Sequence, residues 1–144
     1  HDTSKAVTGL VSWNNYTASI RLCLTIAEEF YCGQWTSVTF RTLPSAPGQV
    51  RNVNVTKFGE DHEVALVSPF QTNGSIRGYE VTWYCPPESS SPSGILHVTE
   101  MGAHSSVALQ GLKDDVPCLV TVAAFNEYQG EKLVGAFYNI TFLP

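Results

Sequence analysis

The chain has 144 residues, of which 43% are hydrophobic and 15% are charged, a balance that supplies a folded core and excludes a disordered tail. Lysine and arginine total 8 against 13 acidic residues, and the resulting net charge of −5 argues against a nucleic-acid-binding protein, because contacts to phosphates require a positive surface. No apolar run reaches the roughly 20 residues of a membrane-spanning helix.

The first elements predicted along the chain are β-strands. Every second residue is apolar in one stretch, which comprises Tyr16, Ala18, Ile20, Leu22 and Leu24, and a further strand is predicted over 38–41. The following residues, 43–48, contain two prolines, which favour an extended connector over a central strand. We therefore predict a first unit over 1–43, a proline-rich linker over 44–48 and a complete domain over 49–144.

Seven short strands are predicted in the second part of the chain. Turn residues such as Asn73-Gly74 and a polar, proline-containing surface loop over 86–94 lie between them. The apolar positions of the strands are Val50, Val53 and Val55; Val64 to Val67; Tyr79, Val81 and Trp83; Ile95 and Val98; Val107 and Leu109; Val120, Val122 and Ala124; and Leu133 to Leu143. Short strands bounded by turn residues predict an all-β, antiparallel β-sandwich.

Cysteines and glycan acceptor sequences indicate the cellular compartment. The four cysteines, Cys23, Cys32, Cys85 and Cys118, fit two disulfides, and three pairings are open at this point. A zinc site would require closely spaced pairs such as C-x2-C, which the sequence lacks. Four asparagines begin N-x-S/T sequences without an intervening proline: Asn15, Asn54, Asn73 and Asn139. These features together predict a secreted or extracellular glycoprotein.

Two stretches carry a resemblance to fibronectin type III domains. Residues 78–83 (GYEVTW) resemble the third strand of that family, and the stretch from Leu112 to Asn126 resembles its leucine, loop and sixth strand. Residues 10–22 repeat the latter pattern and are followed by a final strand at 36–42. The resemblance implies one complete immunoglobulin-like sandwich preceded by the last strands of another. Because such a partial sandwich leaves an apolar face uncovered, we expect its missing strands to belong to a part of the protein absent from this chain.

The resemblance also implies a disulfide pairing. Tyr16 occupies the position of the family's corner tyrosine, whereas the second unit has Cys118 at that position. Cys85 ends the strand that would neighbour the one beginning at Cys118, so a Cys85–Cys118 bridge is favoured, with Cys23 pairing with Cys32. We also expect Trp83 to be the central core aromatic residue, because Val67 stands where the family usually has a buried tryptophan.

The sequence favours binding over catalysis. It contains no G-x-S-x-G, H-E-x-x-H or phosphate-binding glycine motif, so we expect neither enzymatic activity nor a cofactor or metal site. Loops at the ends of such sandwiches carry recognition. The candidate protein-binding residues are Phe70 and Gln71, after the second strand of the complete domain, and Glu127, Tyr128 and Gln129, in its last hairpin.

Residues 33–39 (GQWTSVT) are similar to a degenerate form of the tryptophan–serine box of class I cytokine receptors, in which tryptophans stack with arginines, and Arg21 is the available partner. These resemblances imply the ectodomain of a cell-surface receptor of the cytokine-receptor, phosphatase or kinase kind. It would bind a protein ligand or co-receptor, would have neighbouring fibronectin type III domains and would be anchored in the membrane by a part outside this chain. The alternative is an adhesive or matrix module without a signalling role.

Overall fold

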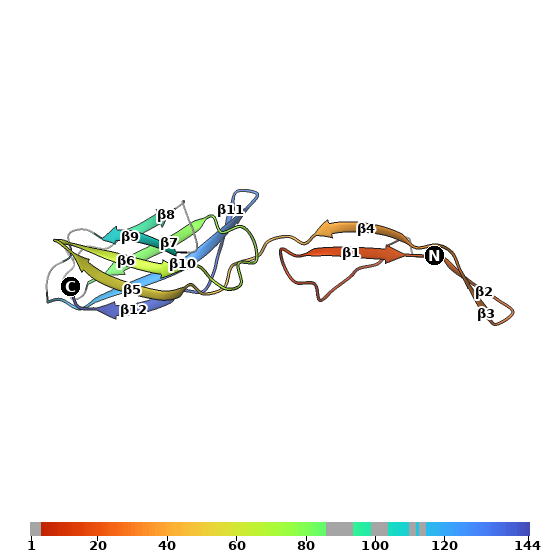
Figure 1. The fold of residues 1–144 in the computed structure, drawn as a ribbon, viewed down its shortest axis with the longest axis horizontal. Coiled ribbons are helices and arrows are strands. Elements are labelled where there is room, and N and C mark those ends of the chain that lie inside the picture. Colours follow the sequence, from red (N-terminus) through yellow and green to blue (C-terminus); the bar gives the residue numbers. More distant parts are fainter. Residues whose placement is uncertain (1–3, 86–93, 99–103, 110–111, 113–114) are drawn as a thin grey trace. The chain divides into compact units, whose positions relative to one another are not determined.

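The computed structural model describes residues 4–85, 94–98, 104–109, 112 and 115–144. The loop predicted over 86–94 lies outside these residues, apart from Gly94. The chain folds as two compact units, His1–Leu43 (unit 1) and Pro44–Pro144 (unit 2). Every regular element in the described ranges is a β-strand (Figure 1), and none of these residues forms a helix long and apolar enough to cross a membrane.

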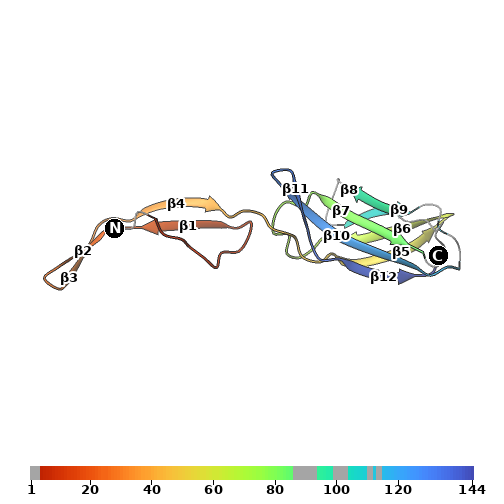
Figure 2. The same ribbon diagram turned by 180° about the vertical axis from the view of Figure 1, so that it is seen from behind.

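Unit 2 is a sandwich of two antiparallel sheets, as both views of the ribbon show (Figures 1 and 2). One sheet has the order β5–β6–β9, with bounds Arg51–Phe58, Asp61–Val67 and His104–Leu109. The other has the order β11–β10–β7–β8, with β12 also paired to β10. Its bounds are Glu131–Val134, Cys118–Tyr128, Gly78–Tyr84, Gly94–Val98 and Tyr138–Phe142. The predicted all-β, antiparallel sandwich is therefore confirmed.

The last predicted strand is interrupted, so that it forms β11 and β12. Gly135 lies between them, where its N–H donates to the carbonyl of Ala124 at 2.9 Å. A Cβ at Gly135 would collide with the Pro47 carbonyl. The chain therefore passes so close to residues 47–48 at this point that only glycine fits, and the single strand predicted over Leu133–Leu143 divides there.

The core of unit 2 lies between its two sheets and follows the period-2 alternation of the strands. β6 alternates between half-buried and buried side chains along its whole length. The core residues are Val50, Val53, Val64, Leu66, Tyr79, Val81, Leu109, Val120, Val122 and Ala124. The expectation that Trp83 is the central aromatic is wrong: Trp83 is only partly buried, whereas Tyr79 is 1% exposed and lies opposite the small Ala124. Burial raises the pKa of the Tyr79 phenol above its ordinary value.

Unit 1 contains two antiparallel pairs of strands. β1 (Asn15–Ile20) pairs with β4 (Thr36–Arg41), and β2 (Cys23–Ile26) pairs with β3 (Glu29–Cys32). The Tyr16 hydroxyl accepts a hydrogen bond from the Val11 N–H at 2.9 Å, as expected of a corner tyrosine. Unit 1 thus has the local geometry of the end of a sandwich without the second sheet.

The two units repeat the same hairpin at a constant offset of 102 residues, which takes Tyr16 to Cys118. The pairs Tyr16↔Phe40 and Cys23↔Cys32 of unit 1 correspond to Cys118↔Phe142 and Phe125↔Val134 of unit 2. The hairpin tips have the same backbone conformation as well. Ala27 and Glu28 have positive φ angles, and so do Gln129 and Gly130, which stand at the equivalent positions. The internal repeat predicted from the sequence is therefore present at the level of strand register.

Candidate functional site

Among the residues of unit 2 whose side chains the structure describes, Phe70, in the loop between β6 and β7, is the most exposed large hydrophobic one, with 84% of its surface accessible. The Arg51 guanidinium lies over its ring, with Cζ 3.6 Å from the ring centroid. Arg51 is itself fixed, because its Nε donates to the Ser68 carbonyl at 2.7 Å. The stacked arginine holds the aromatic ring in place while leaving most of it open to a partner.

A buried asparagine ties this loop to β10 and to the start of unit 2. Asn126 is 1% exposed, and its Nδ2 donates to the carbonyls of Ser45 and Thr72, at 2.8 Å each. Gly74 packs against it so closely that a Cβ there would lie 2.6 Å from Asn126 Nδ2. Asn126 thereby fixes the base of the loop that presents Phe70.

The residues interpreted as a linker, 44–48, belong to unit 2 and run along the same loop. The N–H of Ser45 donates to Asn73 O at 2.9 Å, and the N–H of Gly48 donates to Gln71 O at 2.8 Å. Pro47 is buried. The proline-rich segment is therefore extended, and its backbone is hydrogen-bonded to a loop. Pro44 and Pro47 fit there because the N–H groups that donate to the loop belong to Ser45 and Gly48.

The other candidate residues lie at the tip of the β10–β11 hairpin. Glu127 Oε2 is 3.8 Å from Arg77 Nε, and Gln129 Nε2 donates to the Tyr128 hydroxyl at 3.3 Å. The N–H of Arg77 donates to the carbonyl of Phe125, so the loop and the hairpin are joined by the backbone as well as by Asn126. The structure therefore places the two predicted groups of residues on two segments that are tied together.

The exposed residues at this end of unit 2 include aromatic and arginine side chains, two types that are enriched at protein interfaces. Within the described ranges, no group of three or more histidine, cysteine or acidic residues is arranged to hold a metal ion.

The sequence analysis did not predict two residues that organise this end of unit 2, the buried Asn126 and Arg51. Asn126 follows Val120, Val122 and Ala124 at the next inward-facing position, so a polar residue in an apolar alternation was the available signal. No feature of the sequence indicates the role of Arg51, because its contact with Phe70 joins two segments that are distant in the sequence.

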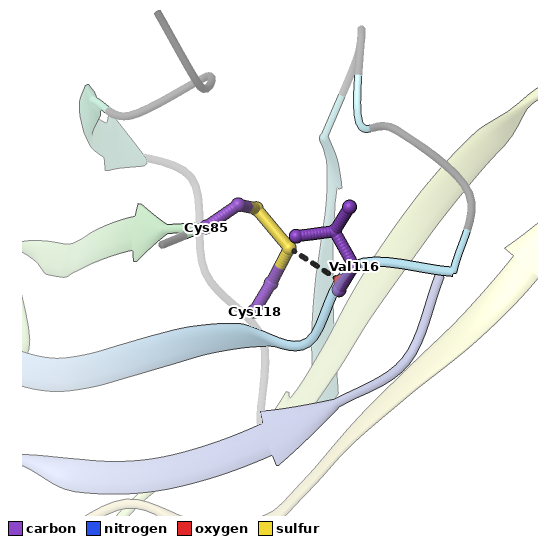
Figure 3. The surroundings of a disulfide bond; sticks show 3 residues. All are labelled: Cys85, Val116 and Cys118. Carbon is purple, nitrogen blue, oxygen red and sulfur yellow. Dashed lines mark hydrogen bonds between the residues drawn. A yellow bond between two sulfur atoms is a disulfide. The ribbon is translucent and has the colours of Figure 1, made fainter. Parts of the chain in front are cut away.

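The disulfide of unit 2 closes the opposite end of the β7–β10 pair. Cys85 and Cys118 are each 1% exposed and are bonded across two neighbouring strands, with a sequence separation of 33 residues (Figure 3). Cys118 Sγ lies 3.3 Å from the Val116 carbonyl oxygen, a polar contact and not a hydrogen bond, because a disulfide sulfur carries no hydrogen. The bridge occupies the position of the corner tyrosine of unit 1.

The second disulfide joins Cys23 and Cys32, which lie directly opposite each other in the β2–β3 hairpin. This is the pairing that the resemblance favoured. In the segment similar to a tryptophan–serine box, Arg21 Cζ lies 4.4 Å from the centroid of the Trp35 ring, which is the stack proposed from the sequence. A second stack joins Arg41 to Trp13, at 4.8 Å.

No family model matches the sequence, and no curated protein matches it. Among solved structures, the chain is similar to the extracellular region of rat CD45, domains d3–d4, with a TM-score of 0.64 and 18% sequence identity. The match covers 99% of this chain and 70% of that chain. The fold is fibronectin type III-like. With 18% identity, this similarity is evidence about the fold only. The two antiparallel sheets of unit 2 are consistent with such a fold.

On this fibronectin type III-like framework the four glycan acceptor sequences have different surroundings. Asn15, Asn54 and Asn139 are exposed. Asn73 is half-buried, and its Nδ2, the atom to which a glycan would be attached, donates to the Ala46 carbonyl at 3.0 Å. The neighbouring Gly74 is buried against Asn126.

We expect protein secreted from animal cells to carry glycans at Asn15, Asn54 and Asn139 and to be largely unmodified at Asn73. A sugar on Asn73 Nδ2 would separate the loop from residues 44–48. Peptide mass spectrometry after enzymatic deglycosylation in heavy-oxygen water measures the occupancy of each site, and Asn139 serves as the exposed control. Full occupancy of Asn73 in folded protein would contradict the prediction.

Proposed function

We propose that this chain is a protein-recognition and spacer segment of a cell-surface receptor ectodomain, which binds a protein ligand or co-receptor and catalyses no reaction. The observation that carries the proposal is the fibronectin type III-like fold shared with an extracellular region of CD45. The two disulfides support it, because such bonds persist in oxidising, extracellular compartments.

The binding surface we assign is the end of unit 2 that carries Phe70, Arg51 and the β10–β11 hairpin. Phe70 supplies a large apolar contact area, and Tyr128 adds an amphipathic one. The two segments that present them are tied together by Asn126 and by the hydrogen bond from the Arg77 N–H to the Phe125 carbonyl, so little conformational entropy would be lost on binding.

Substitution of these aromatics tests the surface. We expect Phe70→Ser and Tyr128→Ser each to weaken binding of a protein ligand by about tenfold or more, because exposed aromatics at interface centres contribute most of the affinity. The melting temperature should barely change, since both side chains are exposed. Tyr84→Ser is the matched control, because Tyr84 is half-exposed at the opposite end of β7.

The experiment is a screen of the glycosylated chain, displayed as a multivalent fusion, against cell-surface and secreted proteins, followed by titration of each hit. Saturable 1:1 binding of one protein, weakened by Phe70→Ser and not by Tyr84→Ser, supports the proposal. Binding only to itself or to matrix would favour the adhesive alternative. Turnover of a substrate by purified protein would overturn both.

The cytokine-receptor-like version of this proposal rests on the Arg21–Trp35 stack. This version predicts that the screen identifies a cytokine as the ligand, whereas the receptor-phosphatase-like version does not.

A further inference from the structure

The outer face of the β5–β6–β9 sheet in unit 2, which points away from the core, carries a shallow depression of about 350 Å³. Residues of all three strands line it, among them Asn54 of β5, Ala65 and Val67 of β6 and Ser106 of β9. Its volume lies at the lower end of the range for small-ligand sites, which is about 300–1,000 Å³. The depression therefore offers room for one small group beside Asn54, an exposed glycan acceptor.

Small side chains produce this hollow. Strand register places Asn54, Ala65 and Ser106 in one row across the sheet, in which Asn54 lies opposite Ala65 and Ala65 opposite Ser106. The neighbours of Ala65 in β6, Val64 and Leu66, are buried in the core, so the alternation of the strand turns this row toward the outer face. A methyl group and a hydroxymethyl group fill little of the space above the strands, and the sheet is therefore hollowed directly beside the acceptor asparagine.

A β-bulge in β5 forms the rim of the depression next to Asn54. The register shifts between Arg51 and Asn54, and Asn52, within the bulge, has a φ angle of 50°. Asn54 Nδ2 donates to the Asn52 carbonyl at 3.4 Å, and Asn52 also lines the depression. Glycosylation replaces one of the two Nδ2 hydrogens, so the other remains to make this contact at the exposed side chain. The first sugar therefore begins at the rim of the hollow.

The lining matches the surface of an N-acetylhexosamine. The ring of such a sugar has an apolar face of C–H groups and an edge of hydroxyl and amide groups. Ala65 and Val67, both half-buried, offer an apolar floor, and the exposed Asn52 and Ser106 offer hydrogen-bonding groups at the edge. The described residues that line the depression include no charged side chain, so the ligand that fits it is neutral.

We propose that this depression binds the innermost N-acetylglucosamine of the glycan on Asn54, which packs on Ala65 and Ser106 and stabilises the β5–β6–β9 sheet. Because the sugar is covalently attached at the rim, it meets the depression at a high effective concentration, and weak contacts suffice to hold it. The acceptor sequence alone predicts only attachment, whereas the depression predicts where the sugar lies. The inference requires a glycan on Asn54 and does not depend on which partner unit 2 binds.

A side chain of a protein partner fits this depression less well. Asn54 lies at its rim, so a partner would have to displace the attached glycan before it reached Ala65. The described residues of the lining also include neither an aromatic residue nor an arginine, the types that are enriched at protein interfaces.

Three forms of the chain test the proposal by their melting temperatures. They are the chain secreted from animal cells restricted to high-mannose glycans, the same chain trimmed by an endoglycosidase to one N-acetylglucosamine per acceptor, and Thr56→Val, which lacks only the Asn54 acceptor sequence. We expect the trimmed chain to melt with the fully glycosylated one, because the innermost sugar makes the contact, and Thr56→Val to melt about 4 °C lower. Asn54→Gln should agree with Thr56→Val. An unmodified Asn54, a trimmed chain that melts as low as Thr56→Val, or Thr56→Val that melts with the parent chain would each overturn the proposal.

Two alanines of the same outer face provide matched variants. Ala65→Ile fills the depression and keeps the acceptor sequence, whereas Ala108→Ile places the same side chain one row further along, opposite Glu63. Combined with Ala65→Ile, Thr56→Val should no longer lower the melting temperature, and combined with Ala108→Ile it should lower it by the full amount. Equal effects in the two backgrounds would contradict the assignment. So would a protein ligand whose binding to the chain without this glycan is lost with Ala65→Ile, since the depression would then belong to the partner.

Discussion

Replacement of both Cys85 and Cys118 by alanine is expected to lower the free energy of unfolding of unit 2 by about 3–4 kcal/mol. The bridge closes a loop of 33 residues, and opening it returns conformational freedom to the unfolded chain. For a domain of this size the melting temperature should fall by about 12–30 °C. Differential scanning calorimetry of the variant and the parent protein, both free of reductant, measures the change.

The disulfide of unit 1 provides the control for this experiment. Cys23→Ala with Cys32→Ala removes a bridge that lies wholly within the β2–β3 hairpin, so the unfolding transition of unit 2 should keep its midpoint. A midpoint that falls equally in the two double variants would show that the Cys85–Cys118 bridge is not what stabilises the sandwich.

The change of Asn126 to aspartate should cost about 3–5 kcal/mol at neutral pH. It removes two donated hydrogen bonds and places a carboxylate against the carbonyls of Ser45 and Thr72. Burial and these carbonyls would raise the pKa of the new carboxyl above its unfolded value of about 3.9, so the loss of stability relative to the parent should be smallest below pH 4 and grow as the pH rises.

Denaturant titrations at several pH values measure this difference, with Asn139→Asp as the exposed counterpart, which should cost little at any pH. A cost for Asn126→Asp that is small at pH 7, or independent of pH, would contradict the role assigned to the buried amide. Because Asn126 fixes the loop of Phe70, the variant should also weaken any binding that requires Phe70.

The sequence predicted the architecture because the strands of a sandwich alternate apolar and polar residues and are separated by turn residues. Alternation along 79–83 depends only on which face of a strand is buried, as Tyr79 and Val81 are, and this property is local. The repeated leucine, corner and strand pattern likewise predicted that Tyr16 and Cys118 are equivalent, which the register bears out.

Contacts between distant segments could not be predicted in this way. The pairing of residues 44–48 with the loop of Asn73 depends on three-dimensional proximity, so the proline-rich composition predicts only an extended linker. The burial of Tyr79 in place of Trp83 accompanies a difference in cross-strand partner, since Tyr79 lies opposite the small Ala124 and Trp83 opposite Val120, and this pairing is not visible in the sequence. The candidate loops were predicted by their place in the fold, but the stacking of Arg51 on Phe70 was not.

The equal length of the two hairpins has a consequence for how the protein folds. Tandem repeats with identical register risk exchanging strands while they fold, since either hairpin could add to either half-formed sheet. Two pairs before the end of each hairpin stands the buried Asn126 in unit 2 and the exposed Leu24 in unit 1, so a unit 1 hairpin exchanged into unit 2 would place a leucine among the carbonyls that Asn126 binds. The mismatch favours correct assembly of each repeat.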